Sequence, residues 1–229
     1  MIIAALTDLH GDVSPLRGIA DDLAAADVVV ITGDVTHFGR RAEAARVIEA
    51  VRKYNSRVLA VPGNCDYPEV AALLTEEGIN LDCTVREIDG VTFAGIGGSL
   101  PCPGTTPNEM TDDEMNARLE RLGRVLPSGR PLVVAAHQPP HGTEADLLAS
   151  GVHVGSRSLR AFIEKHSPLI CFTGHIHEGR TIDTVVATGT VVATDTVVAT
   201  KVVNPGPLGY GHHAVAEISN RVERLEIRG

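Results

Sequence analysis

The chain has 229 residues, of which 43% are hydrophobic and 21% are charged, values that suit one α/β domain with a substantial core. Its formal net charge of −9, without a run of Lys and Arg, argues against tight binding of a nucleic-acid backbone. Aromatic residues make up only 3% of the chain, which leaves few stacking surfaces for bases.

Five short apolar runs predict buried strands. Each run has four to six residues, is rich in Val, Ile and Leu, and is bounded by Gly, Pro or polar residues. The runs are residues 1–6, 28–31, 58–61, 132–136 and 169–172.

Helices are predicted after the first three strands. Apolar residues recur at helical spacing over residues 13–23 and 44–51, and Pro68 opens a short helix that runs to Leu74. This alternation of strands and helices predicts a largely parallel sheet with right-handed crossovers.

The rest of the chain adds two hairpins and two helices. The hairpins are predicted from runs that flank short turns, namely residues 84–88 with 91–96 and residues 214–218 with 222–227. The helices are predicted over residues 111–126, which open with the capping box of Thr111 and Glu114, and over residues 158–165. We find no linker that would divide the chain, so we expect a single domain over residues 1–229.

One segment repeats itself: Thr-Val-Val-Ala-Thr occurs at residues 184–188, 190–194 and 196–200. A single strand of this length would reach about 55 Å at roughly 3.3 Å per residue, against a radius of gyration of about 17 Å for a domain of this size. We therefore expect a β-hairpin insertion at about 184–201, with Gly189-Thr190 as its type II′ turn. The insertion is either an arm that joins two copies into a homodimer or a tandem duplication without functional consequence.

The N-terminus enters a strand directly and has no basic segment followed by a long apolar one, so we expect no signal peptide. No run of 18 or more apolar residues occurs, so no membrane span is expected. The four cysteines show no C-x-x-C spacing and are expected to be free thiols in the cytoplasm.

Side chains that can bind a metal follow each of the five apolar runs. In an open α/β sheet, ligands bind beyond the carboxyl ends of the strands, so these side chains are expected to meet at one edge of one sheet. Each residue alone is weak support for a metal site, but the ordered set is informative. The seven residues are Asp8, His10, Asp34, Asn64, His137, His175 and His177.

This ordered set resembles the calcineurin-like metallophosphoesterase superfamily, whose pattern is D-x-H, G-D, G-N-H-[D/E], H and G-H-x-H. The resemblance spans residues 8–177 and departs from the pattern at Cys65, where the family usually has His. Residues 97–99, 137–140 and 204–207 also resemble the family's small single-domain prokaryotic members. The resemblance implies a four-layer α/β/β/α sandwich with a dimetal site at the carboxyl ends of the strands.

The same resemblance implies two divalent metal ions. It assigns Asp34 as the bridging carboxylate, which also makes it a catalytic residue. It places Asp8, His10 and His177 at one ion, and Asn64, His137 and His175 at the other. Mixed imidazole, carboxylate and amide ligands suit manganese, which we favour, as well as iron, zinc, cobalt or nickel.

The function implied is hydrolysis of a small phosphoester by a hydroxide bound to the two ions, with a diester favoured as the substrate. Two alternatives stay open: a phosphomonoesterase, and a catalytically weak interaction module on the same fold. A membrane partner is not expected.

The departure at Cys65 leaves the proton donor for the leaving group open. A thiol with a pKa near 8.5 is a weak acid at neutral pH, so Cys65 either contacts the substrate or is a small buried residue. His141 and His153 are candidates to supply the proton instead. Asp66 is expected to hold the Asn64 loop through hydrogen bonds. The remaining histidines are expected to be surface or structural residues: His37, His166, His212 and His213.

Overall fold

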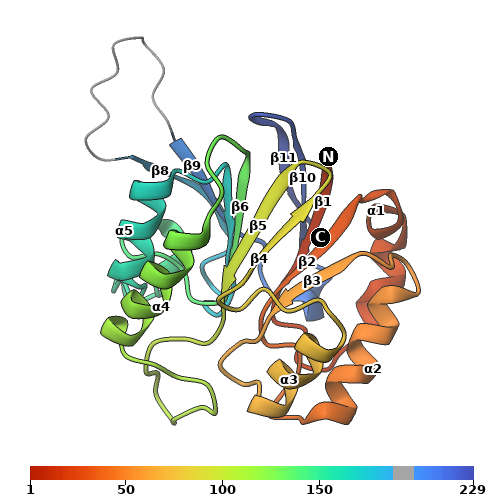
Figure 1. Cartoon of the computed structure of the whole chain (residues 1–229). Coiled ribbons are helices and arrows are strands. Elements are labelled where there is room, and N and C mark those ends of the chain that lie inside the picture. Colours follow the sequence, from red (N-terminus) through yellow and green to blue (C-terminus); the bar gives the residue numbers. More distant parts are fainter. Residues whose placement is uncertain (188–198) are drawn as a thin grey trace.

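The computed structural model describes residues 1–187 and 199–229, which form two β-sheets between two groups of helices (Figure 1). The first sheet has the strand order β11-β10-β1-β2-β3. In it β1, β2 and β3 run parallel, and β10 and β11 form the predicted closing hairpin. The strands are β1 (Ile2–Leu6), β2 (Val28–Thr32), β3 (Val58–Val61), β10 (His213–Ile218) and β11 (Val222–Arg228).

The second sheet has the order β4-β5-β6-β7-β9-β8. Its four central strands are parallel, and its two outer pairs are antiparallel. The strands are β4 (Val85–Ile88), β5 (Val91–Ile96), β6 (Leu132–Ala136), β7 (Ile170–Phe172), β8 (Thr181–Val186) and β9 (Ala199–Asn204).

The helices begin close to where the sequence predicts. Thr111 caps α4 as expected: its hydroxyl accepts from the Glu114 backbone N–H at 3.3 Å, and the Glu114 carboxylate accepts from the Thr111 N–H at 2.8 Å. The predicted helix over residues 13–23 is instead a 3-10 helix, Ser14–Ile19, followed by a short α-helix. The α-helices are α1 (Ala20–Ala25), α2 (Arg41–Arg52), α3 (Pro68–Glu76), α4 (Asp112–Val125) and α5 (Arg157–His166).

Three hydrophobic clusters separate four layers. The first packs α1, α2 and α3 against one face of the first sheet, with Leu6 and Ile31 among its members. The second lies between the two sheets and includes Phe93 and Phe172. The third packs α4 and α5 against the outer face of the second sheet. The two groups of helices accordingly lie on opposite sides of the two sheets (Figure 1), so the four-layer α/β/β/α sandwich is confirmed.

The expectation that all five apolar runs belong to one sheet is wrong. The first three runs form β1, β2 and β3 of the first sheet, and the last two form β6 and β7 of the second. A strand buried on both faces has the same continuous apolar run whether a helix or another sheet covers it. The run therefore predicts burial but does not reveal which neighbour provides it.

Strands β8 and β9 contain the ends of the repeat segment. They pair antiparallel, with Val186 opposite Ala199. The predicted turn at Gly189-Thr190 and the middle copy of the repeat lie outside the described residues. Within the described ranges, no helix has the length and apolar character needed to cross a membrane. All four cysteines are described, and they are free thiols as predicted.

Candidate metal centre

The carboxyl ends of strands from both sheets deliver the predicted ligand side chains to one place. Three sets of side chains have potential ligand atoms within 4.8 Å of one another. Asp8 or Asp34 is present in every set, so the sets form one cluster rather than three sites. The sets are Asp8, His10 and His177; His10, Asp34 and Cys65; and Asp8, Asp34 and His137.

Asp34 lies at the centre of this cluster. Its Oδ2 atom is 3.8 Å from His10 Nε2, and its Oδ1 atom is 3.4 Å from His137 Nε2. The two oxygens of one carboxylate therefore face two different histidines. His10 follows β1 of the first sheet, and His137 follows β6 of the second. Asp34 therefore lies between a ligand residue from each sheet. This arrangement fits the bridging position that the sequence resemblance assigns to Asp34.

On one side of Asp34, ring nitrogens and a carboxylate oxygen converge. His177 Nε2 is 3.3 Å from both His10 Nε2 and Asp8 Oδ1. The other oxygen of Asp8, Oδ2, accepts hydrogen bonds from the Thr7 hydroxyl at 2.8 Å and from the His175 backbone N–H at 3.1 Å. These bonds leave Oδ1 to face the histidines.

On the other side, three acceptor atoms converge. His137 Nδ1 lies 2.8 Å from the Thr32 carbonyl oxygen, which can only accept, so Nδ1 carries the proton and Nε2 presents a lone pair in the neutral ring. This Nε2 atom is 2.8 Å from Asn64 Oδ1 and 3.4 Å from Asp34 Oδ1. Facing acceptors repel unless a proton or metal cation lies between them, so the donor set fits a divalent ion. The His175 ring packs beside His137, with centroids 5.2 Å apart.

The protonation states of the cluster favour metal binding. Burial lowers the pKa of His10, and it lowers the pKa of His175 to about 4. Burial opposes ionisation of Asp8, but the hydrogen bond with His177 and the attraction of neighbouring imidazoles together outweigh it, so the pKa of Asp8 is lowered. The same bond raises the pKa of His177. Metal ligands bind in the deprotonated form, so an ion that binds His177 must displace the proton that Asp8 helps to hold there.

The backbone of the cluster is strained. Four ligand residues other than glycine have left-handed φ angles: 51° at Asp8, 47° at His10, 46° at Asp34 and 67° at His175. Such angles are uncommon for residues with a Cβ atom and cluster at functional sites. These backbone conformations direct side chains that are close in sequence, such as those of Asp8 and His10, toward the same cluster.

Glycine is required beside Asp34 because the backbone there is too close for a side chain. A Cβ atom at Gly63 would lie 2.0 Å from Asp34 Oδ1 and 2.1 Å from the Asp34 backbone nitrogen. A Cβ atom at Gly33, where φ is 99°, would lie 2.3 Å from His137 Nδ1. The absence of a side chain at these two glycines allows the ends of β2, β3 and β6 to approach one another.

Asp66 holds the loops around the cluster, as predicted. Its buried carboxylate accepts backbone N–H bonds from Val35 at 3.0 Å, Thr36 at 2.8 Å and Gly63 at 2.8 Å. The Thr36 hydroxyl adds a fourth bond at 2.8 Å. Asp66 therefore fastens the Asn64 loop and also the loop that follows Asp34.

Cys65 lies at the cluster but carries no charge there. Its sulfur belongs to the set with His10 and Asp34, its backbone N–H donates to Asp34 Oδ1 at 2.8 Å, and 7% of the residue is exposed. Burial and the Asp34 carboxylate raise the pKa of the thiol. Cys65 is thus a small buried residue that borders the cluster, and its contact with a substrate stays a prediction.

His141 and His153 lie together but apart from the cluster. Their Nδ1 atoms approach Asp146, at 3.5 Å for His141 and 2.7 Å for His153. Asp146 is fully buried and also accepts backbone N–H bonds from Thr143 and Gly155, both at 2.8 Å. In the described part of the chain, no hydrogen bond, ion pair or ring contact connects either histidine to the seven ligand residues. The structure thus brings the two histidines to each other and not to Asp34.

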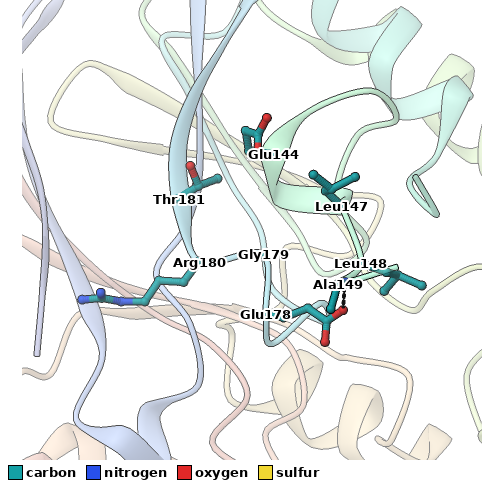
Figure 2. A pocket seen from close by; sticks show the side chains of 8 residues that line it. All are labelled: Glu144, Leu147, Leu148, Ala149, Glu178, Gly179, Arg180 and Thr181. Carbon is teal, nitrogen blue, oxygen red and sulfur yellow. Dashed lines mark hydrogen bonds between the residues drawn. The ribbon is translucent and has the colours of Figure 1, made fainter. Parts of the chain in front are cut away.

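A hollow of about 300 Å³ lies beside the ligand loop, between residues 144–149 and 178–181 (Figure 2). Glu178 directly follows ligand residue His177 and accepts a bond from the Ala149 N–H at 2.5 Å. Arg180 is turned away from Glu178 in Figure 2, and its guanidinium donates to the Pro205 carbonyl at 3.2 Å. The carboxylates of Glu144 and Glu178 therefore border the hollow, which does not suit a phosphate. The bond between Glu178 and Ala149 connects the loop that contains His153 to the loop that contains His177.

Several residues near the cluster were not predicted. The His37 ring, expected to be a surface group, is exposed and also packs edge-on against His10 with centroids 5.3 Å apart. Thr7 orients Asp8, and Thr106 accepts a bond from the Asn64 side chain at 3.1 Å. Thr7 could have been suspected from its place next to Asp8, but Thr106 lies in a loop that is distant in sequence.

Comparisons with known proteins point to one family. The sequence model of the calcineurin-like phosphoesterase family matches residues 1–179. The uncharacterized protein MJ1162 of Methanocaldococcus jannaschii is 39% identical over 214 residues, which cover 92% of this chain and 90% of that protein.

Solved structures share the fold at low sequence identity. TT1561 of Thermus thermophilus is similar with a TM-score of 0.71 and 20% identity, over 100% of this chain and 98% of that chain. The purple acid phosphatase PPD1 of yellow lupin is similar with a TM-score of 0.55 and 14% identity, over 89% of this chain and 43% of that chain.

Proposed function

Because the chain belongs to the calcineurin-like phosphoesterase family, whose members are metal-dependent phosphoesterases, we propose that it hydrolyses small phosphodiesters at the cluster centred on Asp34. The observation that carries the proposal is the position of this carboxylate, whose two oxygens face His10 at 3.8 Å and His137 at 3.4 Å. We propose two divalent ions, with manganese favoured, because the ligand set combines imidazole, carboxylate and amide groups.

When bound, two divalent ions neutralise the charge of the phosphoester and lower the pKa of water, which supplies the nucleophile. The chain's own residues hold and orient this centre. Asp34 joins its two halves, and Asp8 and Asn64 present oxygens on either side. His137 is fixed in one tautomer by the Thr32 carbonyl, and its Nε2 lone pair faces the centre.

A diester is favoured over a monoester by the charges around the cluster. Within the described residues, the ion pairs of Asp8 and Asp34 are formed with histidines and not with Arg or Lys. A diester carries one negative charge and a monoester up to two, so a monoester needs more positive charge from its site. The Cys65 thiol, whose pKa is raised, adds neither a positive charge nor an acidic proton.

His141 and His153 are our candidates for the group that protonates the leaving group. His153 Nδ1 is hydrogen-bonded to Asp146 at 2.7 Å and His141 Nδ1 lies 3.5 Å from the same carboxylate, while no hydrogen bond of the described residues involves either Nε2 atom. The rings are partly exposed, at 28% and 38%. The bond between Glu178 and Ala149 fastens their loop to that of His177, so a substrate on the metal ions could extend toward them.

The test is a paired assay on protein loaded with manganese, with bis-p-nitrophenyl phosphate as the diester and p-nitrophenyl phosphate as the monoester. Asp34→Asn is compared with Asp89→Asn, a matched change in an exposed ion pair with Arg57. We expect diester turnover that EDTA and Asp34→Asn abolish and Asp89→Asn preserves.

Other outcomes have definite meanings. Faster turnover of the monoester would replace our proposal with a phosphomonoesterase. Two bound ions per chain without turnover of either ester would favour the interaction module. Turnover that survives both EDTA and Asp34→Asn would show that the cluster is not the active site.

A further inference from the structure

The side-chain amide of Asn64 has a definite orientation at the metal centre. Its Nδ2 atom donates to the Thr106 hydroxyl at 3.1 Å, and its Oδ1 atom faces His137 Nε2 at 2.8 Å. An asparagine amide can rotate by half a turn with almost no change in shape, which exchanges oxygen and nitrogen. Only the observed orientation presents an oxygen, which is a metal ligand, to the cluster.

For the neutral His137 ring, the form that binds a metal, the opposite orientation of the amide would be the better one in the absence of an ion. The neutral His137 ring has its lone pair on Nε2, because Nδ1 donates to Thr32. A rotated Asn64 would then donate from Nδ2 to this lone pair instead of opposing it with oxygen. Some other group must therefore hold the amide in the orientation that suits a metal.

Thr106 and Glu109 provide this constraint. The Thr106 hydroxyl has one proton, and Glu109 Oε1 lies 2.7 Å away. An ionised carboxylate only accepts, so the hydroxyl proton is directed at Glu109 and a hydroxyl lone pair faces Asn64. That lone pair can be satisfied by the amide NH2 group and not by the amide oxygen.

The loop that carries both residues is fixed against Asn64. Glu109 Oε1 also accepts from the Thr106 backbone N–H at 2.7 Å and from Cys102 Sγ at 3.1 Å. Asn108 donates from its backbone to the Asn64 carbonyl at 3.1 Å and from its side chain to the Gly63 carbonyl at 3.0 Å. The Thr106 hydroxyl is thus held at the Asn64 side chain by bonds on both sides.

We propose that Thr106 and Glu109 are positioning residues for the metal centre, and that Glu109, acting through Thr106, orients Asn64 with Oδ1 toward the ions. The proposal rests on the proposed function only in taking Asn64 as a metal ligand. Hydrogen-bond partners of metal ligands commonly contribute about 10- to 100-fold to metal affinity, and we expect that range here for one of the two ions.

The test measures metal binding in the absence of substrate, by titrating the apoprotein with Mn²⁺ in a calorimeter. Two pairs of variants separate the role of each group. Thr106→Val removes the hydroxyl and Thr106→Ser keeps it, while Glu109→Ala removes the acceptor and Glu109→Gln keeps a carbonyl oxygen. Glu87→Gln, in an exposed ion pair with Arg130, is the control for loss of a carboxylate.

We expect Thr106→Val and Glu109→Ala to bind one of the two ions about 10- to 100-fold more weakly. Thr106→Ser, Glu109→Gln and Glu87→Gln should bind both ions like the wild type. A cobalt-loaded sample gives a second readout, because loss of the Asn64 oxygen changes the visible absorption of Co²⁺. If Thr106→Val does not fold, the Glu109 pair alone decides.

Wild-type affinity for both ions in Thr106→Val and Glu109→Ala would overturn the proposal, as would equal losses in all five variants. A wild-type protein that binds no metal would overturn this proposal together with the proposed function. A wild type that binds two ions with the expected differences among variants, yet hydrolyses no ester, would contradict the proposed function alone.

Discussion

The side-chain amide of Asn204 donates to the backbone carbonyl of Ile176 at 2.8 Å. Ile176 lies between the ligand residues His175 and His177, so a residue at the end of β9 holds the turn that places both histidines. Asn204 is buried, and its Oδ1 atom accepts from the Gly206 N–H at 3.0 Å. Both hydrogen-bonding groups of this side chain are therefore occupied with shaping the rim of the metal centre.

We expect Asn204→Ala to weaken metal binding by about 10- to 100-fold, because the turn between the two histidines loses its support. The Ile176 carbonyl would keep the Gly179 N–H, which donates to it at 2.9 Å, but would lose the Asn204 bond, at a cost of about 0.5–1.5 kcal/mol in the free energy of unfolding. Calorimetric titration with Mn²⁺ and urea unfolding of the apoprotein measure the two effects. Asn220→Ala, at an exposed turn, is the control, and equal metal affinity in both variants would show that the bond does not position the histidines.

Substitution of Gly63 by Ala should disrupt the centre without introducing a polar group. The added Cβ atom would lie 2.0 Å from Asp34 Oδ1 and 2.1 Å from the Asp34 backbone nitrogen, so the backbone would have to move. We expect the free energy of unfolding to fall by about 1–3 kcal/mol or more, together with loss of metal binding. Gly18→Ala is the matched control, since a Cβ atom there meets nothing within 4 Å and should change stability by about 0.5 kcal/mol or less. Urea unfolding and calorimetric titration of both variants with Mn²⁺ make the comparison.

Residues near strand ends could be predicted from the sequence, because a buried strand and the turn after it leave a local pattern. Asp8, Asp34 and His137 each follow such a run, and the structure brings them within 4.8 Å of one another. The division of the strands between two sheets could not be predicted from the runs themselves. Phe172 packs between the sheets while its neighbour Cys171 packs against the outer helices, yet both are simply apolar in the sequence.

The supporting residues were harder to predict, because their partners are distant in the chain. Thr106 and Glu109 have the T-x-x-E spacing that opens a helix at Thr111 and Glu114. At Thr106 the same local pattern instead closes a loop, and the hydroxyl meets Asn64, 42 residues away in sequence. Local spacing identifies the bond between Thr106 and Glu109, but only the folded chain shows what that bond orients.

Metal affinity should rise with pH because of His177. Its hydrogen bond with Asp8 raises its pKa above 6.5, whereas burial lowers the pKa of His10 and His175. An ion that binds His177 must displace its proton, so affinity is weak below that pKa, increases through it and becomes constant above it. Calorimetry in buffers of different ionisation enthalpy should detect this proton release on binding, and His177→Gln should remove it. Proton release unchanged in His177→Gln would assign the titration to another ligand.

The role proposed for His141 and His153 predicts a dependence on the leaving group. A good leaving group such as p-nitrophenolate departs without a proton, so His153→Gln should hydrolyse bis-p-nitrophenyl phosphate at nearly the wild-type rate. For a dialkyl or alkyl aryl diester whose alkoxide is a poor leaving group, loss of a general acid should lower kcat by about 100-fold. His141→Gln tests the second histidine in the same way, and His166→Gln, on α5, is the control.

The two substrates also separate a catalytic role from a structural one. Asp146 binds the loops through the N–H groups of Thr143 and Gly155, so a histidine that merely supports Asp146 would affect both esters equally when replaced. A selective loss on the poor leaving group, with unchanged metal affinity, is the result our proposal requires. An equal loss on both esters would place His141 and His153 in the framework of the loop and leave the proton to a water molecule.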